Sequence, residues 1–328
     1  MMFKRSWLAL LLLKLALLTG CAFNSDPPAK ADTQPVVPLQ DLPGAGGYET
    51  AKQIGTITDP QLKEVSGLAA SRVNKGVWWV HNDSGNEPVL FCLDQNFKLL
   101  TPQGIRLQGA HNWDWEDIAY HPGPQGGEIW VADSGNNFNL PTRKLVYRCS
   151  ESDLESQINR EQQASVPCNV LTEGVFERPW WHWANDSEAL LCWHDQAYLV
   201  SKNRTPFRLT GARGQAQLYR LQGATWPIVS HLKYCAGWIT AADLSQAAGL
   251  VALLTHLPSK GVVLFRLPVQ GDDLFSQPSA EIALSGLGQC EALCFADPDH
   301  LVITNEQGQV FQLDISAQRR LLLNLPPP

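Results

Sequence analysis

Acidic side chains recur at the start of short apolar segments along this chain, at intervals of 52, 72, 55 and 48 residues. Acids are poor strand formers, so a repeated acid at this place indicates a role beyond local structure. Carboxylates gathered at one centre either bind a cation or accept hydrogen bonds from backbone N–H groups. The series is Glu64, Glu116, Glu188, Asp243 and Glu291.

A second set of polar residues ends the apolar segment that follows each acid. It comprises His81, Asp83, Asp133, Asn137, Lys202, His256 and Glu306. Antiparallel pairing puts the end of one strand beside the start of the strand before it, so both sets should share one face. Calcium takes about six to eight oxygen ligands from carboxylates, amides and carbonyls. We therefore predict calcium ligands among Glu64, Asp83, Glu116, Asp133, Asn137, Glu188, Asp243, Glu291 and Glu306.

The alternative to a metal site is a structural role for the same acids. A carboxylate at the start of a strand can accept hydrogen bonds from the backbone of a neighbouring repeat and so join the two repeats. The residue types alone leave both interpretations open.

Tryptophans occupy two kinds of position. Trp78, Trp79 and Trp130 lie within apolar segments and should belong to the core. Others lie in polar segments ahead of the acids, where an aromatic ring can stack on a sugar ring or a nucleobase. The predicted ligand contacts are Trp113, Trp115, Trp181, Trp183, His81 and Lys202.

The candidate catalytic residues are Glu116, Asp117, His256 and Lys202. Cationic side chains beside a metal site suit an anionic, phosphorylated substrate. The sequence contains no GxSxG, HExxH, P-loop or dinucleotide-binding motif. Ligand binding without catalysis is therefore the other interpretation of this site.

The elements that must position these residues repeat in the same order. Each acid opens a strand-like segment, and two or three further segments follow it, as in EDIAY, EIWVAD and KLVYRC. Four short antiparallel strands per repeat of roughly 40–50 residues describe a β-propeller blade. We predict an all-β, five-bladed propeller, with residues 52–58 supplying the last strand that closes the ring. Six blades are the alternative, because residues 319–325 can fill the same place, and a β-sandwich is the other architecture.

The N-terminus resembles that of a bacterial lipoprotein. Residues 1–20 combine Lys4 and Arg5 with an apolar run, which is typical of a signal peptide. They end in Leu-Thr-Gly before Cys21, which resembles the lipobox in which the cysteine is acylated. Ala22 rather than aspartate implies the outer membrane. Residues 21–47 are predicted to be a flexible tether, and residues 48–328 the propeller domain.

The composition limits the classes of possible binding partner. The net charge of −7 argues against nucleic acid, which leaves a small molecule, a glycan or a protein. Of the eight cysteines, seven follow Cys21, so they cannot all pair within one chain. We predict one disulfide, between Cys149 and Cys168, because the two fall in adjacent strands of one blade.

The ordered phrases VSGLAAS, WEDIAYH, IWVADSGNN, NDSEALL and CEALCF resemble a group of secreted bacterial β-propeller proteins, over about residues 50 to 315. More distantly, the pattern is similar to calcium-dependent propeller phosphohydrolases, namely β-propeller phytases and five-bladed apyrases. That likeness implies calcium at the channel mouth and phosphate ester hydrolysis. The chain lacks the cluster of phosphate-binding cations found in those families, so binding of a ligand or partner through the acidic, tryptophan-rich face is the preferred prediction.

Overall fold

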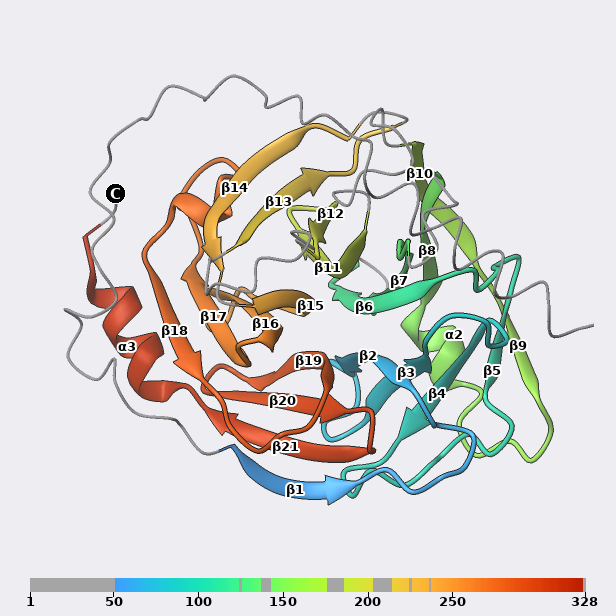
Figure 1. The fold of residues 1–328 in the computed structure, drawn as a ribbon. Coiled ribbons are helices and arrows are strands. Elements are labelled where there is room, and N and C mark those ends of the chain that lie inside the picture. Colours follow the sequence, from blue (N-terminus) through green and yellow to red (C-terminus); the bar gives the residue numbers. More distant parts are fainter. Residues whose placement is uncertain are drawn as a thin grey trace, which may run out of the picture. The chain divides into compact units, whose positions relative to one another are not determined.

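The computed structural model describes residues 51–123, 126–136, 143–175, 186–202, 214–223, 226–235 and 237–326. Their strands form five sheets around a common centre, antiparallel apart from one parallel pair (Figure 1). Each sheet is one blade, numbered I to V in chain order. The five-bladed propeller is therefore confirmed, and the six-bladed and sandwich alternatives are wrong.

The blades are built from consecutive strands, with the innermost strand first. Blade I contains β2 (Val65–Ala70), β3 (Trp78–Asn82), β4 (Val89–Leu93), β5 (Ile105–Gln108) and β9 (Ala164–Pro167). Blade II contains β6 (Trp115–His121), β7 (Glu128–Asp133), β8 (Arg143–Ser150) and β10 (Asn169–Val175). Blade III contains β11 (Ser187–Trp193), β12 (Gln196–Ser201), β13 (Gly214–Arg220) and β14 (Ile228–Cys235). Blade IV contains β15 (Gly237–Ser245), β16 (Leu250–Pro258), β17 (Gly261–Arg266) and β18 (Ser279–Ala283), with the 3₁₀ turn η4 (Leu274–Ser276).

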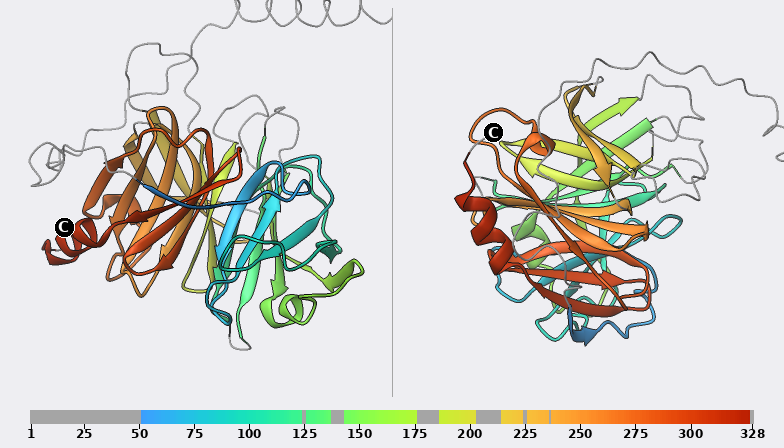
Figure 2. Two further views of the ribbon diagram at one scale, coloured as in Figure 1. Left: turned by 90° about the horizontal axis from the view of Figure 1, so that it is seen from below. Right: turned by 60° about the vertical axis from the view of Figure 1, so that its left-hand side comes forward.

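Blade V is completed from the other end of the described chain. It contains β19 (Cys290–Asp297), β20 (His300–Asn305) and β21 (Gln309–Asp314), and β1 (Lys52–Thr56) pairs antiparallel with β21. Residues 52–58 thus supply the closing strand, as predicted. Residues 319–325 do not, because they lie largely in helix α3 (Ser316–Asn324), which packs against β17 and β18 (Figure 2).

The long interval between blades II and III holds an excursion. After β8, helix α2 (Glu151–Glu155) begins at Ser150, whose hydroxyl accepts a hydrogen bond from the backbone of Asp153. The chain then adds β9 to blade I in parallel with β5, and returns to blade II as β10. The interval still contributes one blade.

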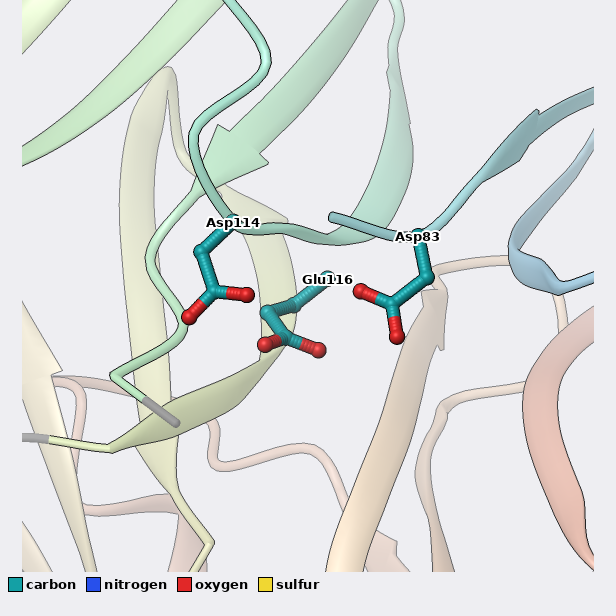
Figure 3. Close-up of side chains that lie close together, drawn as sticks. All are labelled: Asp83, Asp114 and Glu116. Carbon is teal, nitrogen blue, oxygen red and sulfur yellow. The ribbon is translucent and has the colours of Figure 1, made fainter. Parts of the chain in front are cut away.

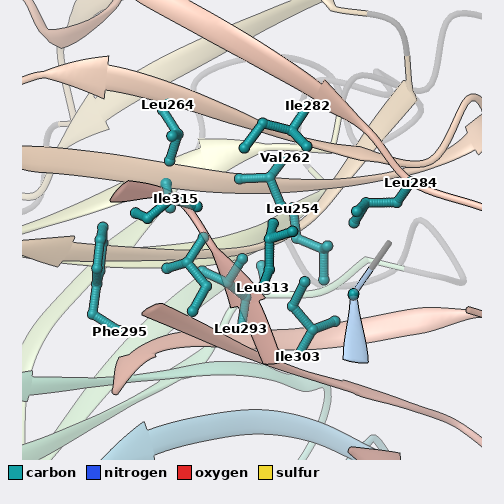
Figure 4. Close-up of a cluster of buried hydrophobic side chains, with 14 of the residues drawn as sticks. Leu254, Val262, Leu264, Ile282, Leu284, Leu293, Phe295, Ile303, Leu313 and Ile315 are labelled. Carbon is teal, nitrogen blue, oxygen red and sulfur yellow. The ribbon is translucent and has the colours of Figure 1, made fainter. Parts of the chain in front are cut away.

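The core lies between blades rather than within them. Five buried apolar clusters fill the five interfaces between neighbouring blades. In the interface between blades IV and V, Leu254 and Val262 face Leu293 and Leu313 (Figure 4). Because both faces of each sheet are covered, the strands are nearly continuous apolar runs. Trp78, Trp79 and Trp130 are buried there, as predicted.

The cysteine pair is adjacent but not bonded. Asn169 of β10 pairs with Arg148 of β8, which places Cys168 opposite Cys149. A hydrogen bond with Cys168, together with burial, raises the pKa of the Cys149 thiol. Both residues are free thiols in this structure, so the predicted proximity is confirmed and the disulfide itself stays a prediction.

Within the described part of the chain, no helix combines the length and the apolar character that crossing a membrane requires. The segments predicted as signal peptide, lipidation site and tether, including Cys21, lie outside the described residues.

Candidate functional site

Every innermost strand carries a β-bulge close to its start. The register shifts between Val65 and Gly67, Trp115 and Asp117, Ser187 and Ala189, Ile239 and Ala241, and Cys290 and Ala292. A bulge leaves one residue outside the regular pairing and re-aims its side chain. The five bulge residues, in blade order, are Ser66, Glu116, Glu188, Thr240 and Glu291.

Three of these bulge residues are acids, and the other two carry hydroxyl groups that join blades. The Ser66 hydroxyl donates to the Glu116 carbonyl at 2.8 Å, and the Thr240 hydroxyl donates to the Cys290 carbonyl at 3.0 Å. Glu64 and Asp243, which the sequence series grouped with Glu116, therefore occupy different structural positions.

A backbone hydrogen bond fixes the second set of polar residues at the same mouth. In four blades the first residue after the second strand donates its N–H to the carbonyl two residues ahead of the bulge. The four bonds are Asp83 to Glu64 (2.9 Å), Ser134 to Asp114 (3.1 Å), Lys202 to Asp186 (2.8 Å) and Glu306 to Gln289 (2.9 Å). Strand starts and second-strand ends share one face, as the topology predicted.

These residues line one cavity of about 470 Å³ at the centre of the ring. Its wall carries Glu64, Asp83, Glu116, Glu188, Glu291 and Glu306, together with Lys202, His256, Trp238 and Gln289. The structure thus brings together six of the nine predicted metal ligands and three of the four predicted catalytic residues, Glu116 being in both sets.

The carboxylates form two overlapping triads that share Glu116. The first triad, Asp83, Asp114 and Glu116, converges on one point (Figure 3). The second consists of Glu116, Asp186 and Glu188. Within each triad, one ligand atom from every residue lies within 4.8 Å of the others. The two triads therefore place five carboxylates around one centre.

Burial raises the pKa values of the carboxyl groups at this centre. Glu116 is 4 % exposed, and burial, followed by the charge of Glu188, raises its pKa well above the ordinary value. Burial raises the pKa of Asp83 to about 6 and that of Glu291 to about 7. The Oε1 atom of Glu116 has no hydrogen-bond partner among the described residues. A buried carboxylate oxygen without a donor is costly, so the centre is set up to accept a cation or protons.

Gly135 makes room for the acids. A Cβ atom at this position would lie 1.8 Å from Oε1 of Glu116 and 2.5 Å from Oδ2 of Asp114. No side chain fits there, and glycine lets both carboxylates approach the backbone.

Two lysines contact residues of the centre. Lys144 of β8 is fully buried and donates to the carbonyl of Gly135. Burial lowers its pKa to about 8, and nearby carboxylates, with Asp186 first, act against that shift. Lys202, which follows β12, forms an ion pair with Glu188. The centre is consequently an acidic cluster partly neutralised by its own ammonium groups.

Two predicted site residues join blades instead. Oδ2 of Asp117 accepts the N–H groups of Leu190 (2.8 Å) and Ala242 (3.2 Å), and Oδ1 accepts that of Ile118 (2.9 Å). Asp243 accepts the N–H groups of Leu244 (2.7 Å) and Phe295 (2.8 Å). With both oxygens engaged by backbone, the geometry does not support Asp117 as a catalytic residue or Asp243 as a metal ligand.

Asp133 supports the site rather than lining its cavity. Its Oδ1 accepts the N–H of Asp114 at 2.8 Å, which holds the loop carrying that ligand. Asn137 lies outside the described residues.

Of the residues predicted to contact a ligand, some are buried and one is exposed. Trp115 is fully buried and donates to the His111 carbonyl at 2.7 Å, so it belongs to the core and not to a binding platform. His81 is also fully buried, packed edge-on against Trp115. Trp113 is 72 % exposed and lines a separate cavity of about 440 Å³. Trp181 and Trp183 lie outside the described residues.

Asp114, Asp186 and Lys144 were missed by the sequence reasoning. For two of them the sequence contains a pattern that could have identified them. Asp114 and Asp186 each stand two residues ahead of a bulge acid, as DWE and DSE. The structure brings the two carboxylates of each pair together. Lys144 had no comparable signal, since a lysine in a third strand is ordinarily solvated.

Comparisons with known proteins leave the family open. No family model matches the chain, and no curated protein matches it. Among solved structures it is similar to the PQQ-bound form of aldose sugar dehydrogenase from Streptomyces coelicolor, with 10 % sequence identity and a TM-score of 0.46. The match covers 80 % of this chain and 97 % of that chain. What the structure establishes is thus a five-bladed β-propeller whose buried acidic clusters are able to bind a metal ion.

Proposed function

We propose that the protein binds a divalent cation at the triad of Asp83, Asp114 and Glu116, and through it a small anionic ligand in the central cavity. The observation that carries this proposal is the Oε1 atom of Glu116, which is buried without a hydrogen-bond partner among the described residues. It belongs to a side chain shared by both carboxylate triads. A cation would supply the missing interaction and relieve the repulsion between the acids.

The ligand chemistry favours calcium. The first triad offers three carboxylates, and carboxylate oxygens are the ligands of hard cations such as calcium and magnesium. The cavity beyond it adds Glu64, Glu291 and Glu306, and calcium accommodates such flexible, oxygen-rich surroundings better than magnesium does.

Other residues that line the cavity support the anionic ligand. They are Lys202, His256 and Trp238. A bound cation and the ammonium group of Lys202 would together hold a phosphate or carboxylate in the cavity. This arrangement also favours a second candidate function, calcium-dependent hydrolysis of a phosphate ester, in which the metal would polarise the phosphoryl oxygen.

Thermal unfolding with calcium and with EDTA tests the metal. A cation that binds only the native state at about 100 times its Kd adds roughly 2.7 kcal/mol of stability, which corresponds to a rise of about 5 °C or more in Tm. The shift should disappear in Glu116→Gln and Asp114→Asn and persist in Glu161→Gln, an exposed acid away from the site. An equal Tm in calcium, magnesium, manganese and EDTA would exclude the metal.

Phosphate titration and hydrolysis assays separate the two candidates. Binding of inorganic phosphate that requires calcium, without turnover of a phosphomonoester panel, supports ligand binding alone. Calcium-dependent turnover that Glu116→Gln abolishes would establish the esterase instead.

We further propose that the chain is anchored to the outer membrane through lipidated Cys21, with the propeller carried on the tether of residues 21–47. The support is the sequence pattern around that cysteine. Membrane fractionation of the wild type and of Cys21→Ser tests it: equal partition into the soluble fraction would argue against the anchor.

A further inference from the structure

The second triad differs from the first in what surrounds it. Glu116, Asp186 and Glu188 are between 2 % and 4 % exposed, so their charges are poorly screened by water. Carboxylates at such a position need cations nearby to remain ionised. Two lysines provide them.

Lys202 neutralises the Glu188 corner of this triad. The two side chains form an ion pair and are 12 % and 3 % exposed, respectively. Lys202 is held in place because its own N–H donates to the carbonyl of Asp186 at 2.8 Å. The backbone of Lys202 is therefore joined to that of Asp186, and its ammonium group is held by the ion pair with Glu188.

Lys144 offsets the negative charge of Asp186 in this triad. Its side chain is fully buried, with Nζ anchored on the Gly135 carbonyl. Of the carboxylates around it, Asp186 acts on it most strongly. Asp186 is itself oriented by the backbone N–H of Asn136, which donates to its Oδ1 at 2.9 Å.

We infer that Lys144 and Lys202 take the place of a second divalent cation at the Glu116–Asp186–Glu188 triad, so that the centre holds one cation, at Asp83–Asp114–Glu116. This inference rests on the proposed metal-binding function. Two carboxylate triads that share a bridging glutamate have the ligand set of a two-metal site. A divalent ion in the second triad would lie against two ammonium groups, and the repulsion between like charges excludes it.

The inference also determines which groups would bind the ligand. In place of a second metal, the cavity presents the ammonium group of Lys202. An anionic group would be bound by one metal ion and one N–H donor, which suits a terminal phosphate or carboxylate that accepts a hydrogen bond.

Counting bound calcium tests the inference. Equilibrium dialysis near neutral pH should give one calcium per wild-type chain. Lys202→Met removes the ammonium group and keeps a side chain of similar length, and it should open the second position, giving two. Lys202→Arg keeps the charge and should still give one. Lys260→Met removes a lysine that bonds to the Gly288 carbonyl outside the triads, and it should also give one.

A second pair of variants assigns each calcium to its triad. Asp83→Asn should lower calcium affinity at the first triad about tenfold or more and bring the count toward zero. Asp83→Asn combined with Lys202→Met should regain one calcium, now at the second triad. Circular dichroism spectra that match the wild type confirm that each variant is folded.

The possible outcomes test the inference separately from the proposed metal-binding function. Two calcium ions in the wild type, or one in Lys202→Met, would overturn the inference and leave the metal-binding function standing. No calcium in either protein would overturn both.

Discussion

Asp117 and Glu116 are neighbours on one strand, yet their replacement should have opposite effects on stability. Asp117 is fully buried and accepts N–H groups from three blades, at Ile118, Leu190 and Ala242. Asp117→Ala leaves three buried donors without their acceptor, at about 1–3 kcal/mol each. We expect a loss of roughly 3–9 kcal/mol in the free energy of unfolding, or a fall of about 6–18 °C in Tm.

Two further variants divide this loss into its parts. In Asp117→Asn, the amide oxygen can replace Oδ2 and keep the bonds from Leu190 and Ala242, while the amide nitrogen faces the N–H of Ile118. About one donor is lost, so the expected cost is roughly 1–3 kcal/mol. Glu116→Gln removes a buried charge that has an unpartnered oxygen, so its Tm in EDTA should equal or exceed that of the wild type.

Differential scanning calorimetry in EDTA measures all three variants under one condition. A Tm for Asp117→Ala within about 2 °C of the wild type would show that the three hydrogen bonds do not hold the blades together. A fall in Tm for Glu116→Gln as large as that for Asp117→Ala would show that the two acids have the same structural role, contrary to their hydrogen bonding.

The remaining predictions concern pH, shape and oxidation. Folding raises the pKa of Asp83 to about 6, so below that pH the unbound protein keeps a proton that calcium must displace. Calcium affinity in titrations should therefore fall at least about tenfold per pH unit below pH 6. A level affinity down to pH 5 would contradict this. Gly135→Ala puts a Cβ atom 1.8 Å from a carboxylate oxygen, so it should abolish the calcium-dependent Tm shift and cost roughly 1–3 kcal/mol; Gly123→Ala, where a Cβ atom meets nothing closer than 3.5 Å, should keep the shift. Oxidation should join Cys149 to Cys168 and add roughly 3 kcal/mol of stability, seen as a mass loss of two hydrogens and a Tm that falls on reduction; an unchanged mass after oxidation would refute the pairing.

Repetition made most of the fold predictable from sequence. Acid-led segments of similar length gave the number of blades, the strand order and the closing segment at residues 52–58. Helix α3 was not foreseen, because its apolar residues over positions 321–323 suit a strand equally well. What decides between the two is the covered edge of β21: β1 already pairs with it, which leaves the last segment no strand to join.

The site was predictable as a face but not residue by residue. Asp243 begins a phrase like that of Glu116, yet the bulge of its strand lies at Thr240, three residues earlier. A bulge is defined by how two strands pair, so the similarity of the two sequence phrases did not reveal the register in this blade. The prediction of Trp115 as a ligand contact was wrong for a related reason. A residue next to a bulge can turn into the core even when its neighbours are polar, and Trp115 is buried.

The repeated bulge also sets limits on how such a site evolves. Each blade offers one aimed position, and duplication of a blade copies that position together with the scaffold. Ser66 and Thr240 use theirs to close the ring through hydroxyl bonds to the next blade. Converting either to glutamate would add a fourth acid to the three at the bulge positions and delete an inter-blade bond in the same step. Ligand number and ring closure thus trade against each other, and an asymmetric centre with three bulge acids in five blades is the compromise that this chain carries.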